Sequence, residues 1–167
     1  DAIPPMDLEH PRVIRLRTFS KAYGLAGLRV GYGLAAPDFV AAFNRIRNHF
    51  GVGRVAQAGA LAALADQGHL LRVLGDIEAA RHRIGEVARA HGLAPLLSAT
   101  NFVTIDCGGD GDFARAVLAG LVARGIFVRM PFTPPQDRCI RVSCGPATAL
   151  DAFEAALPQA LAEARKI

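Results

Sequence analysis

Residues 18–32 read Thr-Phe-Ser-Lys-Ala-Tyr-Gly-Leu-Ala-Gly-Leu-Arg-Val-Gly-Tyr, a stretch that combines an amine, a guanidinium and two hydroxyls. The amine of Lys21 can condense with an aldehyde to form a Schiff base when its surroundings favour the neutral form. The guanidinium of Arg29 presents a planar fork of donors that suits a phosphate, and the hydroxyls of Thr18 and Ser20 add donors. These groups together suit a bound aldehyde that carries a phosphate.

Two short apolar-rich runs flank these polar groups, at residues 13–16 and 30–34. Each run predicts a β-strand, so the lysine and most of the stretch lie on the connection between two strands. Gly24 and Gly27 within that connection allow close approach of the backbone or unusual torsion angles.

Lysine is rare in this chain, which has 17 arginines and two lysines, Lys21 and Lys166. Because positive charge is otherwise supplied by arginine, Lys21 is a candidate for a titratable amine. A solvated lysine with no chemical role, at the junction of a strand and a loop, is the alternative that the residues alone leave open.

The run from Ser20 to Tyr32 resembles, without gaps, the lysine segment of fold-type I pyridoxal-phosphate aminotransferases, especially the histidinol-phosphate aminotransferase group. The resemblance implies that Lys21 binds the cofactor, pyridoxal 5'-phosphate (PLP), as a Schiff base and acts as the proton shuttle. It further implies that Arg29, with Ser20 and Thr18, holds the cofactor phosphate.

The resemblance also implies an α/β fold of the PLP-dependent transferase fold type I. The chain is expected to be truncated, with the end of the large α/β domain and the small α+β C-terminal domain, and to be inactive alone. Residues 1–75 are expected to form the C-terminal part of the large PLP-binding domain and residues 76–167 the small domain. A long helix at about 69–91 is expected to join them.

Hydrophobic periodicity and turn residues predict the remaining elements. A capping box at residues 148–151 predicts the start of the last helix, which Pro158 is expected to kink. Asn101 and Phe102 also resemble the family, and we interpret them as the start of a strand. The other expected helices are 37–50, 55–66 and 113–124, and the expected strands are 101–106, 126–129 and 139–143.

Two arginines in the C-terminal half are candidate substrate ligands. Arg141 alternates with apolar neighbours, a pattern that by itself favours an edge-strand arginine facing water. The family resemblance implies instead that Arg141 binds the substrate α-carboxylate, and that Arg129 lies where the histidinol-phosphate enzymes have an arginine near the substrate phosphate. Surface charge remains the alternative for Arg129. Residues 143–146 depart from the threonine-rich continuation usual in that group, which leaves the substrate open.

The sequence predicts no metal site. Cys107, Cys139 and Cys144 lack metal-ligand spacing and are interpreted as small buried residues of a reducing cytoplasm. Tyr23 and Tyr32 are expected to pack beside the lysine and to take no part in the chemistry.

Composition excludes several classes of protein. The chain is 51% hydrophobic and 20% charged, which is unlike a disordered protein, and its net charge of +4 comes from dispersed arginines. These features predict no nucleic-acid footprint, and no apolar run approaches the length of a membrane span. A cytoplasmic protein is expected.

The sequence therefore predicts an aminotransferase that moves an amino group between an amino acid or amino-alcohol phosphate and a 2-oxo acid, as a homodimer. Two alternatives remain on the same scaffold: a decarboxylase of a phosphorylated amino acid of the threonine-phosphate type, and the aminotransferase-like domain of a transcription regulator. A generic α/β binding domain would leave the pairing of Lys21 with Arg29 unexplained.

Overall fold

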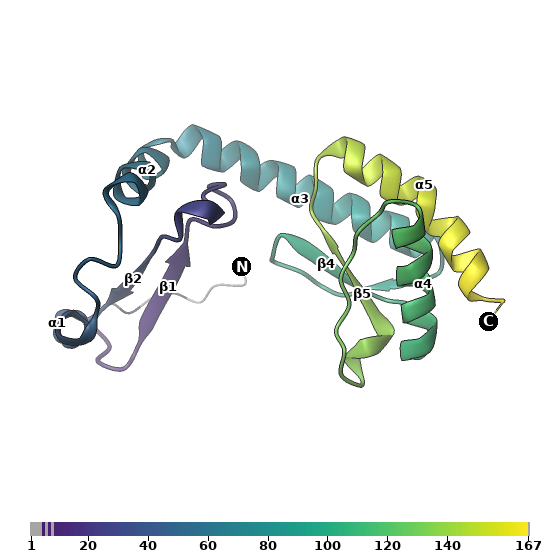
Figure 1. Ribbon diagram of the computed structural model, residues 1–167, viewed down its shortest axis with the longest axis horizontal. Coiled ribbons are helices and arrows are strands. Elements are labelled where there is room, and N and C mark those ends of the chain that lie inside the picture. The colour runs from purple at the N-terminus through teal and green to yellow at the C-terminus, as the bar shows by residue number, and fades with distance from the viewer. Residues whose placement is uncertain (1–4, 6, 8, 167) are drawn as a thin grey trace. The chain divides into compact units, whose positions relative to one another are not determined.

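The computed structural model describes residues 5, 7 and 9–166, and the chain forms two compact units, Asp1–Leu74 and Gly75–Ile167 (Figure 1). The division falls inside the long helix α3 (Gln67–Ala90), close to the boundary expected from the sequence. That the units correspond to the large and small domains of the family stays a prediction. Within the described residues, no helix has the length and apolarity needed to cross a membrane.

The first unit is built on an antiparallel hairpin of two strands, which lie close to the two expected ones. Their pairing runs from Ile14 opposite Ala35 to Thr18 opposite Gly31. A 3₁₀ turn interrupts the connection. The elements are β1 (Ile14–Thr18), η1 (Ala26–Leu28) and β2 (Gly31–Ala35).

Helices α1 (Pro37–Ile46) and α2 (Arg54–Ala65) follow the hairpin. The expectation that the first of them extends to residue 50 is wrong. Its C-cap residue, Arg47, is extended, and the side chain of Asn48 accepts a hydrogen bond from the backbone N–H of Phe50 at 2.9 Å. Such a local side-chain turn competes with continuation of the helix, and Phe50 is left 95% exposed.

The second unit contains the three-stranded antiparallel sheet β3 (Ala94–Pro95), β4 (Phe102–Asp106) and β5 (Cys139–Ser143), in that order. The two longer strands occur where they were expected, whereas β3 was not predicted. The strand expected at residues 126–129 is not formed, and a single β-bridge joins Arg129 to Arg141. The backbone N–H of Ile126 instead completes the preceding helix, and Pro131 has no N–H with which to extend the pairing.

The core of this unit lies between the sheet, the second half of α3, and helices α4 (Gly111–Ala123) and α5 (Ala147–Ala164). Figure 1 shows α4 and α5 side by side next to β4 and β5. Alternation along the strands turns Val103, Ile105, Ile140 and Val142 into the core. The residues between them, Arg141 included, therefore face the opposite side of the sheet.

Helix α5 starts without the expected capping box. Its N-cap is Pro146, and no side chain caps the first turn. The helix contains Pro158 and runs to Ala164, and the expected kink at Pro158 stays a prediction.

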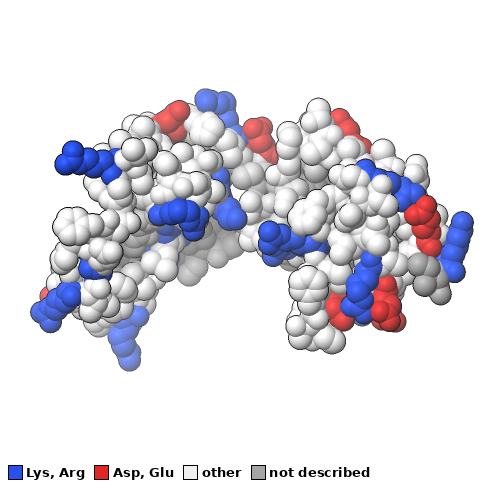
Figure 2. Space-filling view, viewed as in Figure 1, with Lys and Arg blue, Asp and Glu red and all other residues white. Residues whose placement is uncertain are grey.

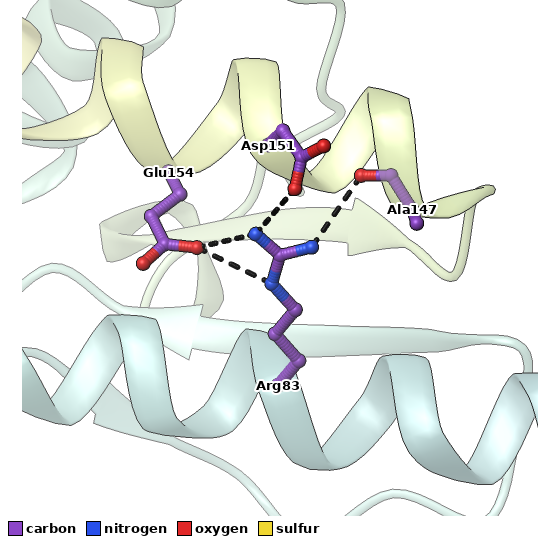
Figure 3. A network of polar contacts seen from close by, with 4 residues as sticks. All are labelled: Arg83, Ala147, Asp151 and Glu154. Carbon is purple, nitrogen blue, oxygen red and sulfur yellow. Dashed lines mark hydrogen bonds and ion pairs between the residues drawn. The ribbon is translucent and has the colours of Figure 1, made fainter.

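Asp151, the expected acidic member of that box, pairs instead with a neighbouring helix. The guanidinium of Arg83 on α3 contacts the carboxylate of Asp151 at 2.7 Å and that of Glu154 at 2.6 Å (Figure 3). Hydrogen bonds to Glu154 and Asp151 raise the pKa of Arg83 above its ordinary value. The network fastens α5 to the second half of α3.

We expect Gly120→Ala to lower the free energy of unfolding by about 1–3 kcal/mol, because α4 and α5 approach too closely for a further carbon atom. A Cβ at position 120 would lie 3.0 Å from the Cβ of Ala160 and 3.1 Å from its Cα. Gly75→Ala is the matched control, because Gly75 lies in α3 with no atom near its Cβ position. The free energy of unfolding of that control should rise by roughly 0.5–1 kcal/mol. Urea denaturation measures both, and equal effects would contradict the close approach.

The charged side chains form separate patches on the face seen in Figure 2, with uncharged surface between them. This distribution agrees with the dispersed arginines of the sequence.

Candidate active site

The four residues predicted to bind the cofactor lie at one end of the hairpin: Thr18 is the last residue of β1, and Ser20, Lys21 and Arg29 belong to the loop that follows. Pairing of the two strands extends one residue beyond Thr18 and Gly31, because the N–H of Phe19 donates to the carbonyl of Val30 at 3.3 Å. The loop 20–29 therefore starts and ends at neighbouring backbone positions. Side chains that are far apart in the sequence share one end of the hairpin.

Hydrogen bonds within the loop fix its first half. The hydroxyl oxygen of Thr18 accepts from the N–H of Ser20 at 3.0 Å. The carbonyl of Lys21 accepts from the N–H of Gly24 at 2.8 Å, which closes a turn directly after the lysine. The backbone that carries Ser20 and Lys21 is thus held by local bonds, while the Thr18 hydroxyl keeps its own proton to donate.

A buried phenylalanine supports this end of the hairpin. Phe19 is 2% exposed, and its ring centroid lies 4.9 Å from that of Tyr23 and 5.7 Å from that of Tyr32. Tilted aromatic pairs at these separations are favourable. The two tyrosines thus pack against the residue two positions before Lys21. That they take no part in the chemistry stays a prediction.

The side chain of Lys21 is exposed, and within the described residues it takes part in no hydrogen bond or ion pair. Its amine is therefore not committed to a structural contact. A primary amine placed in this way is accessible to the carbonyl group of a ligand.

Arg29 has an unusual backbone conformation, with φ of 51° and ψ of 47°. Among the described residues it is the only one other than glycine with positive φ. The left-handed region costs an ordinary residue about 1–2 kcal/mol, and such strain tends to occur at functional sites. One guanidinium nitrogen donates to the carbonyl of Ala26 at 2.9 Å, which leaves most of its five N–H donors for an anion.

The second candidate site lies in the other unit, where the structure places Arg129 directly opposite Arg141. The two residues exchange backbone hydrogen bonds, from Arg129 to Arg141 at 3.1 Å and in return at 2.6 Å. Residues paired in this way project their side chains from the same face of a sheet, and like charges in that position are destabilising. The pair thus concentrates positive charge where an anion would relieve the repulsion.

Both arginines line one cavity of about 480 Å³ with mainly apolar walls. The aromatic rings of Phe127 and Phe132 are largely exposed there. Sequence reasoning did not select these wall residues. The complete lining is Leu118, Val122, Phe127, Val128, Arg129, Met130, Pro131, Phe132 and Arg141.

Phe102, expected from the sequence only as the start of a strand, is a neighbour of Arg141. The guanidinium carbon of Arg141 lies 4.6 Å from the centroid of the Phe102 ring. The signal was present in the alternation of the two strands, which puts both residues on the face away from the core. The cross-strand register was needed to see it, because Thr104, not Phe102, lies directly opposite Arg141.

The cysteines are free thiols with raised pKa values. Burial raises the pKa of Cys107 to about 12, and it also raises the pKa of Cys139 and of Cys144. A thiol with a raised pKa is a poor nucleophile near neutral pH. In the described part of the chain, no group of three or more His, Cys, Asp or Glu side chains is arranged to bind a metal ion.

The chain belongs to the family Aminotransferase class I and II, whose model it matches over residues 4–157. Among curated relatives, histidinol-phosphate aminotransferase 1 of Cupriavidus pinatubonensis is 41% identical over 152 residues, which cover 91% of this chain and 40% of that protein. An aromatic amino acid aminotransferase of Rhodococcus jostii is also 41% identical, over 144 residues that cover 86% of this chain and 38% of that protein.

Among solved structures, histidinol-phosphate aminotransferase from Sinorhizobium meliloti in complex with pyridoxal-5'-phosphate matches with a TM-score of 0.88 and 52% identity. The match covers 93% of this chain and 42% of that one. The α/β fold expected from the lysine segment is thereby confirmed. The chain spans about 40% of the length of the curated relatives that it matches.

Proposed function

We propose that the protein containing this chain is a PLP-dependent aminotransferase that moves an amino group between an amino acid or histidinol-phosphate-like amino-alcohol phosphate and a 2-oxo acid. Membership of the aminotransferase family and the names of the relatives support the reaction. The observation that carries the proposal is the hairpin loop, which holds both Lys21 and Arg29. The amine of Lys21 takes part in no hydrogen bond or ion pair within the described residues. The backbone of Arg29 is strained, and most donors of its guanidinium are unpaired.

The chemistry of these donors fits PLP. Lys21 offers the primary amine that an aldehyde requires, and Arg29 offers a permanent positive charge with a donor fork for the phosphate. The hydroxyls of Thr18, at the end of β1, and of Ser20, in the loop, lie at the same end of the hairpin, and the Thr18 hydroxyl has a proton to donate. When bound, the cofactor supplies the aldehyde and the electron-withdrawing ring.

The protein side chains then have distinct tasks. Lys21 would hold the cofactor covalently, release it to the substrate amine, and carry the proton that leaves the substrate α-carbon. Arg29, Ser20 and Thr18 would anchor the phosphate and so fix the position of the ring. Arg141 would orient the substrate through its α-carboxylate, and Arg129 would bind a second anionic group.

The remaining expectations from the sequence stay predictions. They are action as a homodimer, a cytoplasmic location, and inactivity of this chain alone. The specific amino donor and acceptor likewise belong to the proposal, since an anion site at Arg129 and Arg141 would fit more than one substrate.

Turnover by the purified full-length protein tests the proposal. We expect a new amino acid to form from a 2-oxo acid when histidinol phosphate or an aromatic amino acid serves as donor, measured by chromatography. Release of carbon dioxide from a phosphorylated amino acid would favour the decarboxylase alternative. Absence of both products with every donor would contradict an enzymatic role.

Arg29→Gly in the full-length protein tests whether Arg29 binds the cofactor phosphate or only maintains the conformation of the loop. Glycine accepts the left-handed backbone, so the variant loses the guanidinium without adding strain. We expect affinity for PLP to fall about 10- to 100-fold, as for loss of hydrogen bonds to a charged group. Affinity for pyridoxal, which has no phosphate, should change little. Equal losses for both compounds in a fluorescence titration would assign Arg29 a structural role.

A further inference from the structure

Arg141 lies between a second arginine and an aromatic ring on one face of the sheet. Arg129 is directly opposite it across the β-bridge, and Phe102 is its diagonal neighbour on β4, with the guanidinium carbon 4.6 Å from the ring centroid. Among the described residues, no carboxylate forms an ion pair with Arg141. Within the described residues, the contact that the structure gives the Arg141 guanidinium is therefore the ring of Phe102.

Hydrogen bonds to neighbouring residues hold the backbone of Phe102 in place. Its carbonyl oxygen accepts hydrogen bonds from the hydroxyl of Ser98 at 2.5 Å and from that of Thr100 at 3.2 Å. The Ser98 oxygen also accepts from the N–H of Thr100 at 3.1 Å, and Phe102 pairs with Ser143 on the neighbouring strand. Because the backbone that carries it is restrained, the Phe102 side chain starts from a well-defined position on the sheet.

The position of the Arg141 guanidinium over the Phe102 ring matters for binding. The face of an aromatic ring attracts a cation because the ring quadrupole is negative there, and arginine uses such faces often. When a guanidinium lies over a ring through its carbon, its N–H donors remain in its own plane, where they can form paired hydrogen bonds to an anion. A carboxylate in place of Phe102 would occupy those donors and neutralise the site.

We propose that Phe102 is a positioning residue that holds the Arg141 guanidinium beside Arg129 with its N–H donors free for an anionic group, a carboxylate or a phosphate. The inference rests on the proposed function in one respect, because that function makes Arg141 a substrate ligand. The contact between Arg141 and Phe102 concerns residues of this chain and is measurable without cofactor.

The experiment uses nitrogen-15 NMR of the side-chain Nε–H signals of arginine in the 167-residue chain. Arg141→Lys identifies the Arg141 signal by its disappearance. In the unsubstituted chain the ring current of Phe102 should shift that signal from the position of ordinary exposed arginines. Phe102→Leu, which keeps an apolar side chain but removes the ring, should return it to the ordinary position, and Phe102→Tyr should leave it shifted.

Titration with inorganic phosphate gives the binding readout. Phosphate should perturb the Arg141 and Arg129 signals, and Phe102→Leu should raise the phosphate Kd about three- to tenfold, the loss expected for one cation–π contact. Phe102→Tyr should keep the original Kd. An unchanged signal and an unchanged Kd in Phe102→Leu would overturn the proposal, and so would Phe102→Tyr behaving like Phe102→Leu.

A further variant covers the case in which Phe102→Leu fails to fold. Tryptophan is the best aromatic partner for a cation, so Phe102→Trp should keep the Arg141 signal shifted and the phosphate Kd equal or lower. An ordinary Arg141 signal with weaker binding would overturn the proposal. Lack of transamination by the full-length protein would refute the proposed function and leave these measurements unaffected.

Discussion

Replacing Lys21 with alanine in the full-length protein is expected to lower the rate of transamination on the order of 10⁴-fold, because the variant loses both the covalent anchor and the proton carrier. The near-ultraviolet absorption band of the lysine-linked cofactor should disappear as well. The hairpin itself should persist, since the Lys21 side chain makes no contact that the fold requires within the described residues. Absorption spectra and steady-state kinetics measure the two effects.

The chain supplies its own control for this substitution. Lys166 is the only other lysine, so Lys166→Ala removes the same functional group elsewhere and should leave both the band and the rate unchanged. Lys21→Arg keeps a positive charge but not a nucleophilic amine, and should resemble the alanine variant. Persistence of the absorption band in Lys21→Ala would rule out Lys21 as the anchor.

Arg141→Gln should lower kcat/KM for the amino donor roughly 30- to 900-fold, which corresponds to about 2–4 kcal/mol for a charged group deprived of its partner. The loss arises because a neutral amide cannot replace a guanidinium that meets a carboxylate with two hydrogen bonds. Arg141→Lys keeps the charge without the planar fork, and should give an intermediate value. Steady-state kinetics with the donor varied measure both.

Arg138→Gln is the matched control, because Arg138 pairs with Asp106 at 2.9 Å and does not line the cavity that holds Arg141. It should leave kcat/KM near that of the unsubstituted enzyme. If Arg141→Gln were equally harmless, Arg141 would be the water-facing strand arginine that its sequence pattern first suggested.

Much of the fold was accessible from local patterns. Alternation marked β5 from Cys139 to Ser143 with the observed bounds, and helical spacing marked α3 to within a few residues at either end. The predictions were wrong where contacts between residues distant in the sequence determine the local structure. Asp151 was expected to cap its own helix, but Arg83, remote in the sequence, takes its carboxylate.

The candidate site divides in the same way. The chemistry of Lys21 and Arg29 could be inferred from residue types and their spacing. The left-handed backbone of Arg29 could not, because nothing in the sequence distinguishes a strained arginine from a relaxed one. The placement of Arg129 directly opposite Arg141 could not be predicted from the sequence either. It depends on a single β-bridge, where the sequence predicted a whole strand.

Gly31 limits which residues the hairpin can accept at this position. A Cβ at this position would lie 2.6 Å from the backbone carbonyl oxygen of Arg17, so any larger residue would force the two strands apart or out of register. A slip of one residue reverses the face on which every side chain of a strand lies. An inserted or deleted residue between the strands would have a related effect, because it would change which part of the loop stands opposite Arg29. The length of this loop should therefore be as invariant among functional sequences as the lysine that it carries.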